Sequence, residues 1–130
     1  MGLTRKLIQL KAGIIEFTDF YALGIVNPDI NFDENDRKAF LNACLDYFND
    51  QPFGYISVRN HSYSINPLIY LELNKIDNLR AFAIVSRTSI GRGNAKIEGQ
   101  FFNKPFGIFE TKRDAEKWIN AEVKKSIDTN

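Results

Sequence analysis

The sequence predicts an α/β domain with a mixed β-sheet, in which antiparallel strands at the N-terminus precede alternating helices and strands. Within the first 26 residues, short apolar runs are broken by turn residues, as in an antiparallel meander. The continuous apolar run Ala81–Val85 is typical of a strand that is buried on both faces of a parallel sheet. After residue 33, helical and strand-like segments alternate, which predicts parallel strands joined by helical crossovers.

The N-terminal third contains the antiparallel part. Lys6–Leu10, Ile14–Phe17 and Phe20–Val26 predict two or three strands, because each segment is short, apolar and bounded by turn residues. A polar turn follows, and apolar residues then recur at helical spacing from Ala39 to Phe48. Acidic residues at the start of this segment suit the positive end of a helix dipole, so we expect a first helix here.

The rest of the chain alternates between helices and strands. The expected order is a strand at 53–58, a helix from 66 to about 74, a strand at 81–85, a helix at 89–102, a strand at 106–109 and a helix from 111 to 125. Asn66-Pro67 is a favoured start of a helix, and Thr111-x-x-Asp114 is a capping box. Glycines weaken the helix at 89–102. These patterns predict about four helices in total.

Length and composition restrict the class of protein. The chain has 130 residues, of which 44% are hydrophobic and 25% are charged, so we expect one domain over residues 1–130 without a linker or repeat. No apolar run approaches the roughly 20 residues that span a bilayer. A net charge of +1 gives no global attraction to nucleic acid or membranes, and the N-terminus has no secretory signal pattern. We expect a cytoplasmic protein without a nucleic-acid partner.

Sequence motifs for catalysis are absent. The chain contains none of the phosphate-binding loops, nucleophile elbows or zinc-binding motifs of common enzymes, and it has one histidine and one cysteine. These counts exclude a thiolate and imidazole metal site within a single chain, so we expect no metal and no cofactor. Cys44 lies on the apolar stripe of the first helix and is interpreted as a buried, unreactive thiol. We therefore expect a protein that is not an enzyme.

Two polar segments follow predicted strands of the parallel part. One begins at Arg59 and the other at Ser86, and ligands of open α/β sheets bind at the carboxyl ends of such strands. Helix N-termini at that edge also favour anions. The candidate contacts for a ligand or partner are Arg59, His61, Ser62, Arg87, Thr88 and Ser89. The alternative is that both segments are ordinary solvated loops and that His61 has a structural role.

Charge and aromatic content favour two kinds of ligand. Residues 80–104 contain five basic residues and one acidic residue, which favours a small anionic ligand or an acidic or phosphorylated protein partner. Eleven phenylalanines, five tyrosines and one tryptophan make up 13% of the chain. The aromatic residues between Tyr47 and Tyr55 and between Phe101 and Trp118 are expected to form one core cluster. Alternatively they line an apolar cavity, and periodicity does not distinguish the two.

The end of the chain adds a resemblance. Phe109-Glu-Thr-x-x-Asp-Ala115-Glu-x-Trp118-Ile119, together with Ala81–Val85 and the order of elements, resembles the SpoIIAA-like branch of the STAS superfamily. The resemblance implies that fold, a lack of catalysis and a role in binding. In the anti-sigma factor antagonists of this superfamily, a serine in an Asp-Ser-Ser/Thr-Gly turn is phosphorylated to release a partner kinase. The corresponding turn here is Arg59–Ser64, in which Ser62 or Ser64 would take that role although the Asp and Gly are absent.

Residues and resemblance together predict a non-enzymatic cytoplasmic regulatory or binding domain that resembles anti-sigma factor antagonists. The alternative is a carrier of a small apolar or amphipathic ligand, because the superfamily is similar in fold to Sec14-type lipid carriers. An exposed strand edge in the antiparallel meander also predicts a homodimer.

Overall fold

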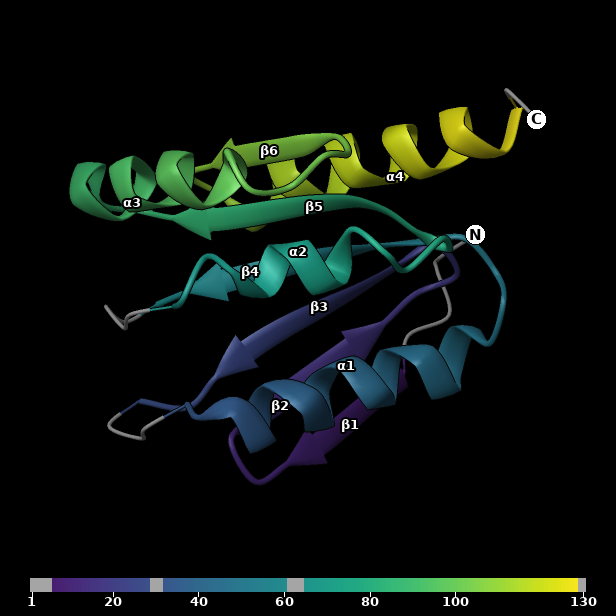
Figure 1. The fold of residues 1–130 in the computed structure, drawn as a ribbon, viewed down its shortest axis with the longest axis horizontal. Helices are drawn as coiled ribbons and strands as arrows, with labels where there is room; N and C mark the ends of the chain where they lie inside the picture. The colour runs from purple at the N-terminus through teal and green to yellow at the C-terminus, as the bar shows by residue number, and fades with distance from the viewer. Residues whose placement is uncertain (1–5, 29–31, 61–64, 129–130) are drawn as a thin grey trace.

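Six strands form one mixed sheet in this computed structural model, which describes residues 6–28, 32–60 and 65–128. Within these residues the strands are β1 (Lys6–Leu10), β2 (Gly13–Phe17), β3 (Tyr21–Val26), β4 (Phe53–Arg59), β5 (Leu79–Ser86) and β6 (Phe106–Phe109). They lie side by side in chain order (Figure 1). β1 to β3 are antiparallel and β3 to β6 are parallel, so the mixed sheet predicted from the sequence is confirmed.

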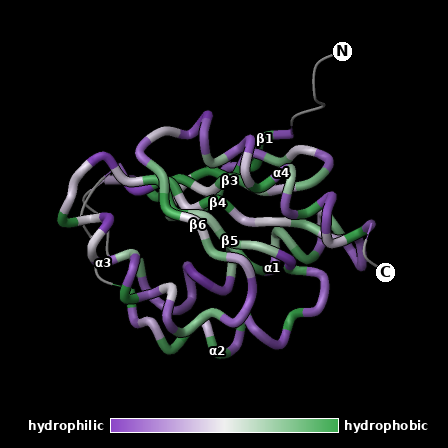
Figure 2. Tube along the Cα trace, turned by 90° about the horizontal axis from the view of Figure 1, so that it is seen from above, coloured by the Kyte–Doolittle hydropathy of each residue, from purple (hydrophilic) through white to green (hydrophobic). Residues whose placement is uncertain are grey.

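Helices cover both faces of the sheet. Within the described residues they are α1 (Glu34–Phe48), α2 (Ile69–Leu73), α3 (Ser89–Gly99) and α4 (Lys112–Asp128). α1, α2 and α3 connect the parallel strands and pack on one face, whereas α4 packs on the other (Figure 1). Figure 2 shows hydrophobic residues concentrated in the strands between these layers. The α/β class and the expected number of helices are therefore confirmed.

Two helices are shorter than their sequence patterns predicted. The helix expected from Asn66 begins at Ile69, because the preceding backbone forms a tighter turn in which the Ile69 N–H donates to the Asn66 carbonyl at 3.2 Å. The Asn66 side chain supports this turn by accepting from the Leu68 N–H at 3.1 Å. The helix expected through Phe102 ends at Gly99, and hydrogen bonds between residues three apart continue the last turn.

Small side chains let α4 approach the sheet closely. Along β5, Ala81 and Ala83 belong to the core on the α4 side, while Phe82 belongs to the core beneath the other helices. On β4, Gly54 lies under α4, and a Cβ added at Gly54 would overlap the side chain of Ile119. The apolar run in β5 is thus buried on both faces, as its composition predicted.

The aromatic residues form two clusters rather than the single cluster expected. Phe109 and Trp118 pack together on the α4 side, with ring centroids 5.5 Å apart. Phe53, Phe102 and Phe106 lie on the opposite side of the sheet. Successive residues of a strand point to opposite faces, so residues that are close in sequence are separated by the sheet.

Four of the five basic residues between 80 and 104 divide into two groups, and the fifth, Lys96, lies in the last turn of α3. Arg80 and Lys104 lie near the amino end of β5, where Lys104 Nζ donates to the Leu79 carbonyl at 2.6 Å. Arg87 and Arg92 follow the carboxyl end of the same strand. The length of β5 separates the groups, so the positive charge that is local in the sequence is not local in space.

Candidate functional site

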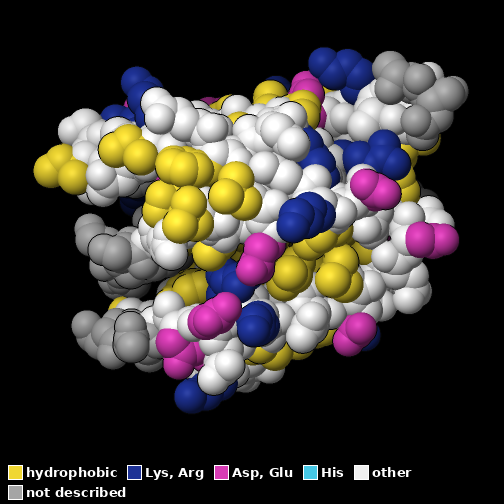
Figure 3. All heavy atoms as spheres, viewed as in Figure 1, with side chains coloured by type: hydrophobic (Ala, Val, Ile, Leu, Met, Phe, Trp, Pro, Cys, Tyr) yellow, Lys and Arg dark blue, Asp and Glu magenta, His cyan; other side chains and the backbone are white. Residues whose placement is uncertain are grey.

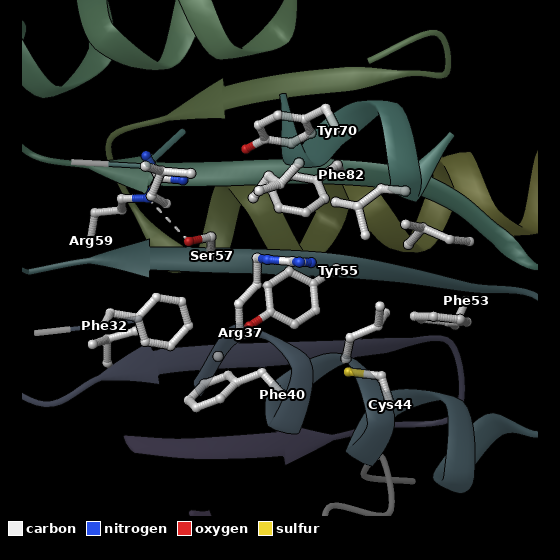
Figure 4. A pocket seen from close by; sticks show the side chains of 17 residues that line it. Phe32, Arg37, Phe40, Cys44, Phe53, Tyr55, Ser57, Arg59, Tyr70 and Phe82 are labelled. Carbon is white, nitrogen blue, oxygen red and sulfur yellow. Dashed lines mark hydrogen bonds between the residues drawn. The ribbon is translucent and has the colours of Figure 1, made fainter. Parts of the chain in front are cut away.

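A pocket lies between α1, α2 and the sheet, on the face opposite α4 (Figure 4). Its cavity volume is about 80 Å³. Most of its wall is apolar and comes from α1 and the segment before it, from α2 and from the strands: Phe32, Phe40, Leu41, Cys44, Phe53, Tyr55, Ile69, Leu73, Leu79 and Phe82. Such a wall binds hydrocarbon groups, because they leave water on entering it. Part of the aromatic content therefore lines a cavity and part forms packed core.

Gly24 on β3 shapes one wall of the pocket. β3 and β4 are parallel neighbours, and Gly24 lies opposite Ser57 in their register. A Cβ added at residue 24 would overlap the Tyr55 hydroxyl and come within 3.4 Å of the Phe40 ring. Glycine at this position therefore lets the Tyr55 ring lie across the strand and face the pocket.

A buried ion pair lies in the part of the wall formed by β4. Arg59 Nη1 and Nη2 donate to the Glu98 carboxylate at 2.5 and 2.8 Å, and the two side chains are 10% and 8% exposed. Arg59 Nε donates to Ser57 Oγ at 3.2 Å, the dashed line in Figure 4. The Tyr70 hydroxyl donates to Glu98 at 2.7 Å. Because the bidentate pair is neutral overall, this part of the wall is polar without a net charge.

Arg37 on α1 lies where the pocket meets the solvent. Its Nη2 is 3.3 Å from a carboxylate oxygen of Glu72 on α2 and 3.5 Å from one of Glu34. An outer hollow of about 290 Å³ shares four residues with the inner pocket and is otherwise mainly polar; the shared residues are Phe32, Arg37, Ile65 and Ile69. Figure 3 shows acidic and basic side chains next to hydrophobic surface in the gap between α1 and α2. The site thus combines a charged entrance with an apolar interior.

The pKa values of Cys44 and Tyr70, which both line the inner pocket, are shifted. Burial raises the pKa of the Cys44 thiol to about 12. Burial, followed by the negative charge of Glu98, raises the pKa of the Tyr70 hydroxyl far above its ordinary value. Both groups therefore keep their protons at neutral pH, and neither is present as a nucleophilic anion.

Of the predicted contact residues that the structure describes, Arg59 alone lines the inner pocket. Arg59 lies in the pocket wall and pairs in register with Ser86, so the two predicted loops leave the same end of the sheet. Arg87 and Ser89 are exposed, and Thr88 is the N-cap of α3. None of these three residues lines the inner pocket. The predicted contacts His61 and Ser62 lie outside the described residues, and so does Ser64, the second candidate for phosphorylation.

Arg37 and Tyr70, which line the pocket, were not predicted from the sequence, and neither was Glu98, which binds Tyr70 and Arg59 from α3. Arg37 lies three residues before Phe40 on the apolar stripe of α1, and Glu98 lies three residues after the fully buried Ala95 of α3. A charged residue at helical spacing within an apolar stripe indicates a charge that is buried and paired. The sequence therefore contained a signal that Arg37 and Glu98 are buried, but it did not show which residue each of them pairs with.

Thr88 has a structural explanation as a helix cap. Its Oγ1 accepts a hydrogen bond from the Gly91 N–H at 2.9 Å. Thr88→Ala is expected to lower the free energy of unfolding by about 1 kcal/mol, because this N–H of α3 then loses its partner. Thr88→Ser keeps the hydroxyl and is expected to retain most of the stability. Urea denaturation of the three proteins measures the effect, and equal stability of Thr88→Ala and wild type would contradict it.

Cys44 is the one cysteine of the chain, so any alkylation by a thiol reagent occurs at this residue. Its rate of alkylation and the pH dependence of the stability both test whether the thiol is buried. Iodoacetamide at neutral pH is expected to alkylate the folded protein far more slowly than the urea-unfolded protein, since only the thiolate reacts. The pKa of the thiol is raised from 9.0 to about 12, so its contribution to stability is complete below pH 9 and is lost as the pH rises toward 12. The free energy of unfolding of wild type and of Cys44→Ala is measured by urea denaturation across this pH range. The part of the loss that is due to the thiol is seen only in wild type. Rapid alkylation of the folded protein would disprove the burial.

The ranges that the structure describes lack both a metal-binding cluster and a membrane-spanning helix. They contain no group of three or more His, Cys, Asp and Glu side chains placed to hold a metal ion. They also contain no helix with the length and hydropathy needed to cross a membrane.

Comparisons with known proteins concern the fold. No family model and no curated protein matches the sequence. Among solved structures, the chain is similar to an uncharacterized protein of the DUF3478 family from Shewanella loihica PV-4, which is described as having a SpoIIAA-like fold. The two share 13% sequence identity with a TM-score of 0.54, over 91% of this chain and 94% of that chain. With its six-stranded mixed sheet and its helices on both faces, this chain has a SpoIIAA-like fold, as its C-terminal motif predicted.

Proposed function

We propose that this protein is a non-enzymatic binding domain whose pocket between α1, α2 and the sheet holds a small amphipathic ligand. The observation that carries the proposal is an apolar cavity with two arginines in its wall, Arg37 at the entrance and Arg59 inside. Ligand pockets commonly combine such an apolar lining with a few polar groups that fix orientation. This proposal takes up the carrier predicted as the alternative from the sequence.

The contacts of the polar groups support binding without catalysis. Arg59 and Tyr70 both donate to Glu98, and Ser57 accepts from Arg59. Cys44 keeps its proton, because burial raises the pKa of the thiol. A general base or a nucleophile needs a group in the reactive ionisation state near the substrate. Arg59 and Tyr70 instead donate their hydrogen bonds to Glu98 and Ser57.

Straight-chain alcohols from 1-butanol to 1-octanol test the apolar cavity as uncharged probes. The affinity is expected to rise by about fourfold for each added methylene until the cavity is full, because each buried methylene contributes about 0.8 kcal/mol. Ile69→Trp narrows the cavity and is expected to weaken 1-hexanol binding by about tenfold. Isothermal titration calorimetry measures both effects.

Leu71→Trp is the matched control on the same helix. Leu71 is 49% exposed and does not line the cavity, so this variant is expected to bind 1-hexanol as wild type does. Circular dichroism confirms that both variants fold. Absence of alcohol binding to the wild type, or equal weakening by the two substitutions, would exclude the cavity as a ligand site.

The regulatory role predicted from the resemblance is the second candidate, and the SpoIIAA-like fold is the observation that favours it. It would operate in the cytoplasm through a protein partner, with Ser62 or Ser64 as the phosphorylated residue. Phosphoproteomic mapping is combined with capture of partners by Ser62→Asp and Ser62→Ala. A phosphorylated serine and different partners for the two variants would support the switch. Unmodified serines and identical partners would exclude it.

A homodimer through β1 is part of this second proposal. Among the described residues, β1 pairs with β2 alone and so lies at an edge of the sheet. An unpaired edge strand offers backbone N–H and C=O groups to a second copy. Light scattering at high protein concentration is expected to give twice the mass of one chain, and the mass of one chain would contradict the dimer.

A further inference from the structure

We propose that the ligand is a short-chain alkyl carboxylate, whose carboxylate binds Arg37 while its alkyl chain fills the inner pocket. This inference rests on the proposed function and names the chemical class of the ligand. It also makes Arg37 the residue that selects an anion over an uncharged molecule of the same length.

The burial of Arg37 differs from that of its partners. The Arg37 side chain is 14% exposed, whereas those of Glu72 and Glu34 are 63% and 68% exposed. A largely desolvated cation gains most from a partner that is desolvated with it, and exposed ion pairs contribute little. The two glutamates are therefore weak partners, and a carboxylate that enters from the outer hollow can replace them.

The donor atoms of Arg37 fit this replacement. Within the described residues, both of its ion pairs use the single atom Nη2, at 3.3 and 3.5 Å. A guanidinium carries five N–H donors, and its strongest arrangement is two parallel bonds to one carboxylate. The present contacts of Arg37 lack this arrangement. A ligand carboxylate would supply it.

Arg59 does not compete for the carboxylate. Its Nη1 and Nη2 both bind the buried Glu98, and its Nε binds Ser57. A ligand carboxylate placed here would have to displace a buried anion from a bidentate pair, which would leave that anion unpaired. The head group therefore binds at the entrance, and the alkyl chain points inward.

The interior is built for the alkyl chain. Phe40, Cys44, Tyr55 and Phe82 bring ring and sulfur surfaces to the cavity from α1, β4 and β5, and Figure 4 shows these side chains around the pocket. The cavity volume of about 80 Å³ is small, so a short chain fits and a membrane-lipid acyl chain does not.

Calorimetric titration with hexanoate and with 1-hexanol tests the proposal at neutral pH, because the two probes share a chain and differ in charge. Wild type is expected to bind hexanoate about tenfold more tightly than 1-hexanol, as charge-assisted bonds to a guanidinium exceed neutral ones. Arg37→Gln is expected to bring this ratio close to one. Glu72→Gln removes a competing carboxylate and is expected to raise hexanoate affinity by about threefold.

Arg37→Lys tests whether the preference for hexanoate depends on the positive charge of Arg37 or on its planar arrangement of donors. It keeps the positive charge without the planar fork, so its hexanoate preference is expected to lie between those of wild type and Arg37→Gln. Glu72→Gln leaves Arg37 in place and keeps the proposal testable if the arginine variants do not fold. Equal affinities of wild type for the two probes, or a preference that persists in Arg37→Gln, would overturn the carboxylate proposal alone. Failure of both probes to bind would overturn the proposed function with it.

Discussion

Arg59→Met is expected to lower the free energy of unfolding by about 3–5 kcal/mol, because the substitution leaves the buried Glu98 carboxylate without its opposite charge. Glu98 is buried and would keep the Tyr70 hydroxyl as its described partner. One neutral donor does not replace two charge-assisted bonds. Urea denaturation followed by circular dichroism measures the loss.

A double variant separates the ion pair from general loss of packing. Arg59→Met combined with Glu98→Leu removes both charges, and its loss is expected to be much smaller than that of Arg59→Met alone. Lys38→Met is the control for charge removal at the surface, since Lys38 forms an ion pair with Glu34 in which both side chains are more than half exposed. A loss for Arg59→Met no larger than that for Lys38→Met would contradict the buried pair.

Phe82→Ala is expected to lower the free energy of unfolding by about 3–5 kcal/mol, because it removes a buried ring from the middle of the core. The Phe82 ring lies 5.3 Å from that of Tyr55 and 5.2 Å from that of Tyr70, and it stacks on Phe106 at 5.9 Å. Thermal and urea denaturation measure the loss. A loss below about 1 kcal/mol would mean that the ring is poorly packed.

Phe82→Ala is also expected to change which length of alcohol binds best. Phe82 lines the inner pocket, so its truncation enlarges the cavity. The alcohol of highest affinity is expected to become longer in Phe82→Ala than in wild type, because more methylenes can leave water. Phe109→Ala is the matched control, since Phe109 lies on the α4 side of the sheet and is half-buried. An unchanged length preference in Phe82→Ala would indicate that alcohols bind elsewhere.

The elements of the fold were predictable because their signals are local. Phe106–Phe109 forms the short strand expected, and the Asp114 N–H donates to Thr111 Oγ1 at 3.2 Å as the capping box predicts. The differences are at the ends of α2 and α3, where hydrogen bonds between residues three apart replace those of an α-helix. Such turns share the apolar spacing of helices, so sequence pattern does not distinguish them.

The candidate site was predictable only in part. Arg59 was expected among the residues that meet a ligand, and it lies in the pocket wall with its donors bound to Glu98. Arg37 was not expected, because its position on the apolar stripe of α1 indicates burial but does not identify a partner. Thr88 was expected at the site because a threonine before a helix is common to anion sites and to caps. The contact with Gly91 identifies it as a cap.

The sequence by itself determined which segments form strands and helices, that the sheet is mixed and that β5 is buried on both faces, because the period and composition of a segment express these properties. Only the tertiary structure decided which side chains meet. Arg59 pairs with Glu98 across 39 residues, and Arg37 with Glu72 across 35. Whether such residues meet depends on the register of neighbouring strands and on the placement of each helix over the sheet. These follow from the packing of the whole chain, to which every element contributes.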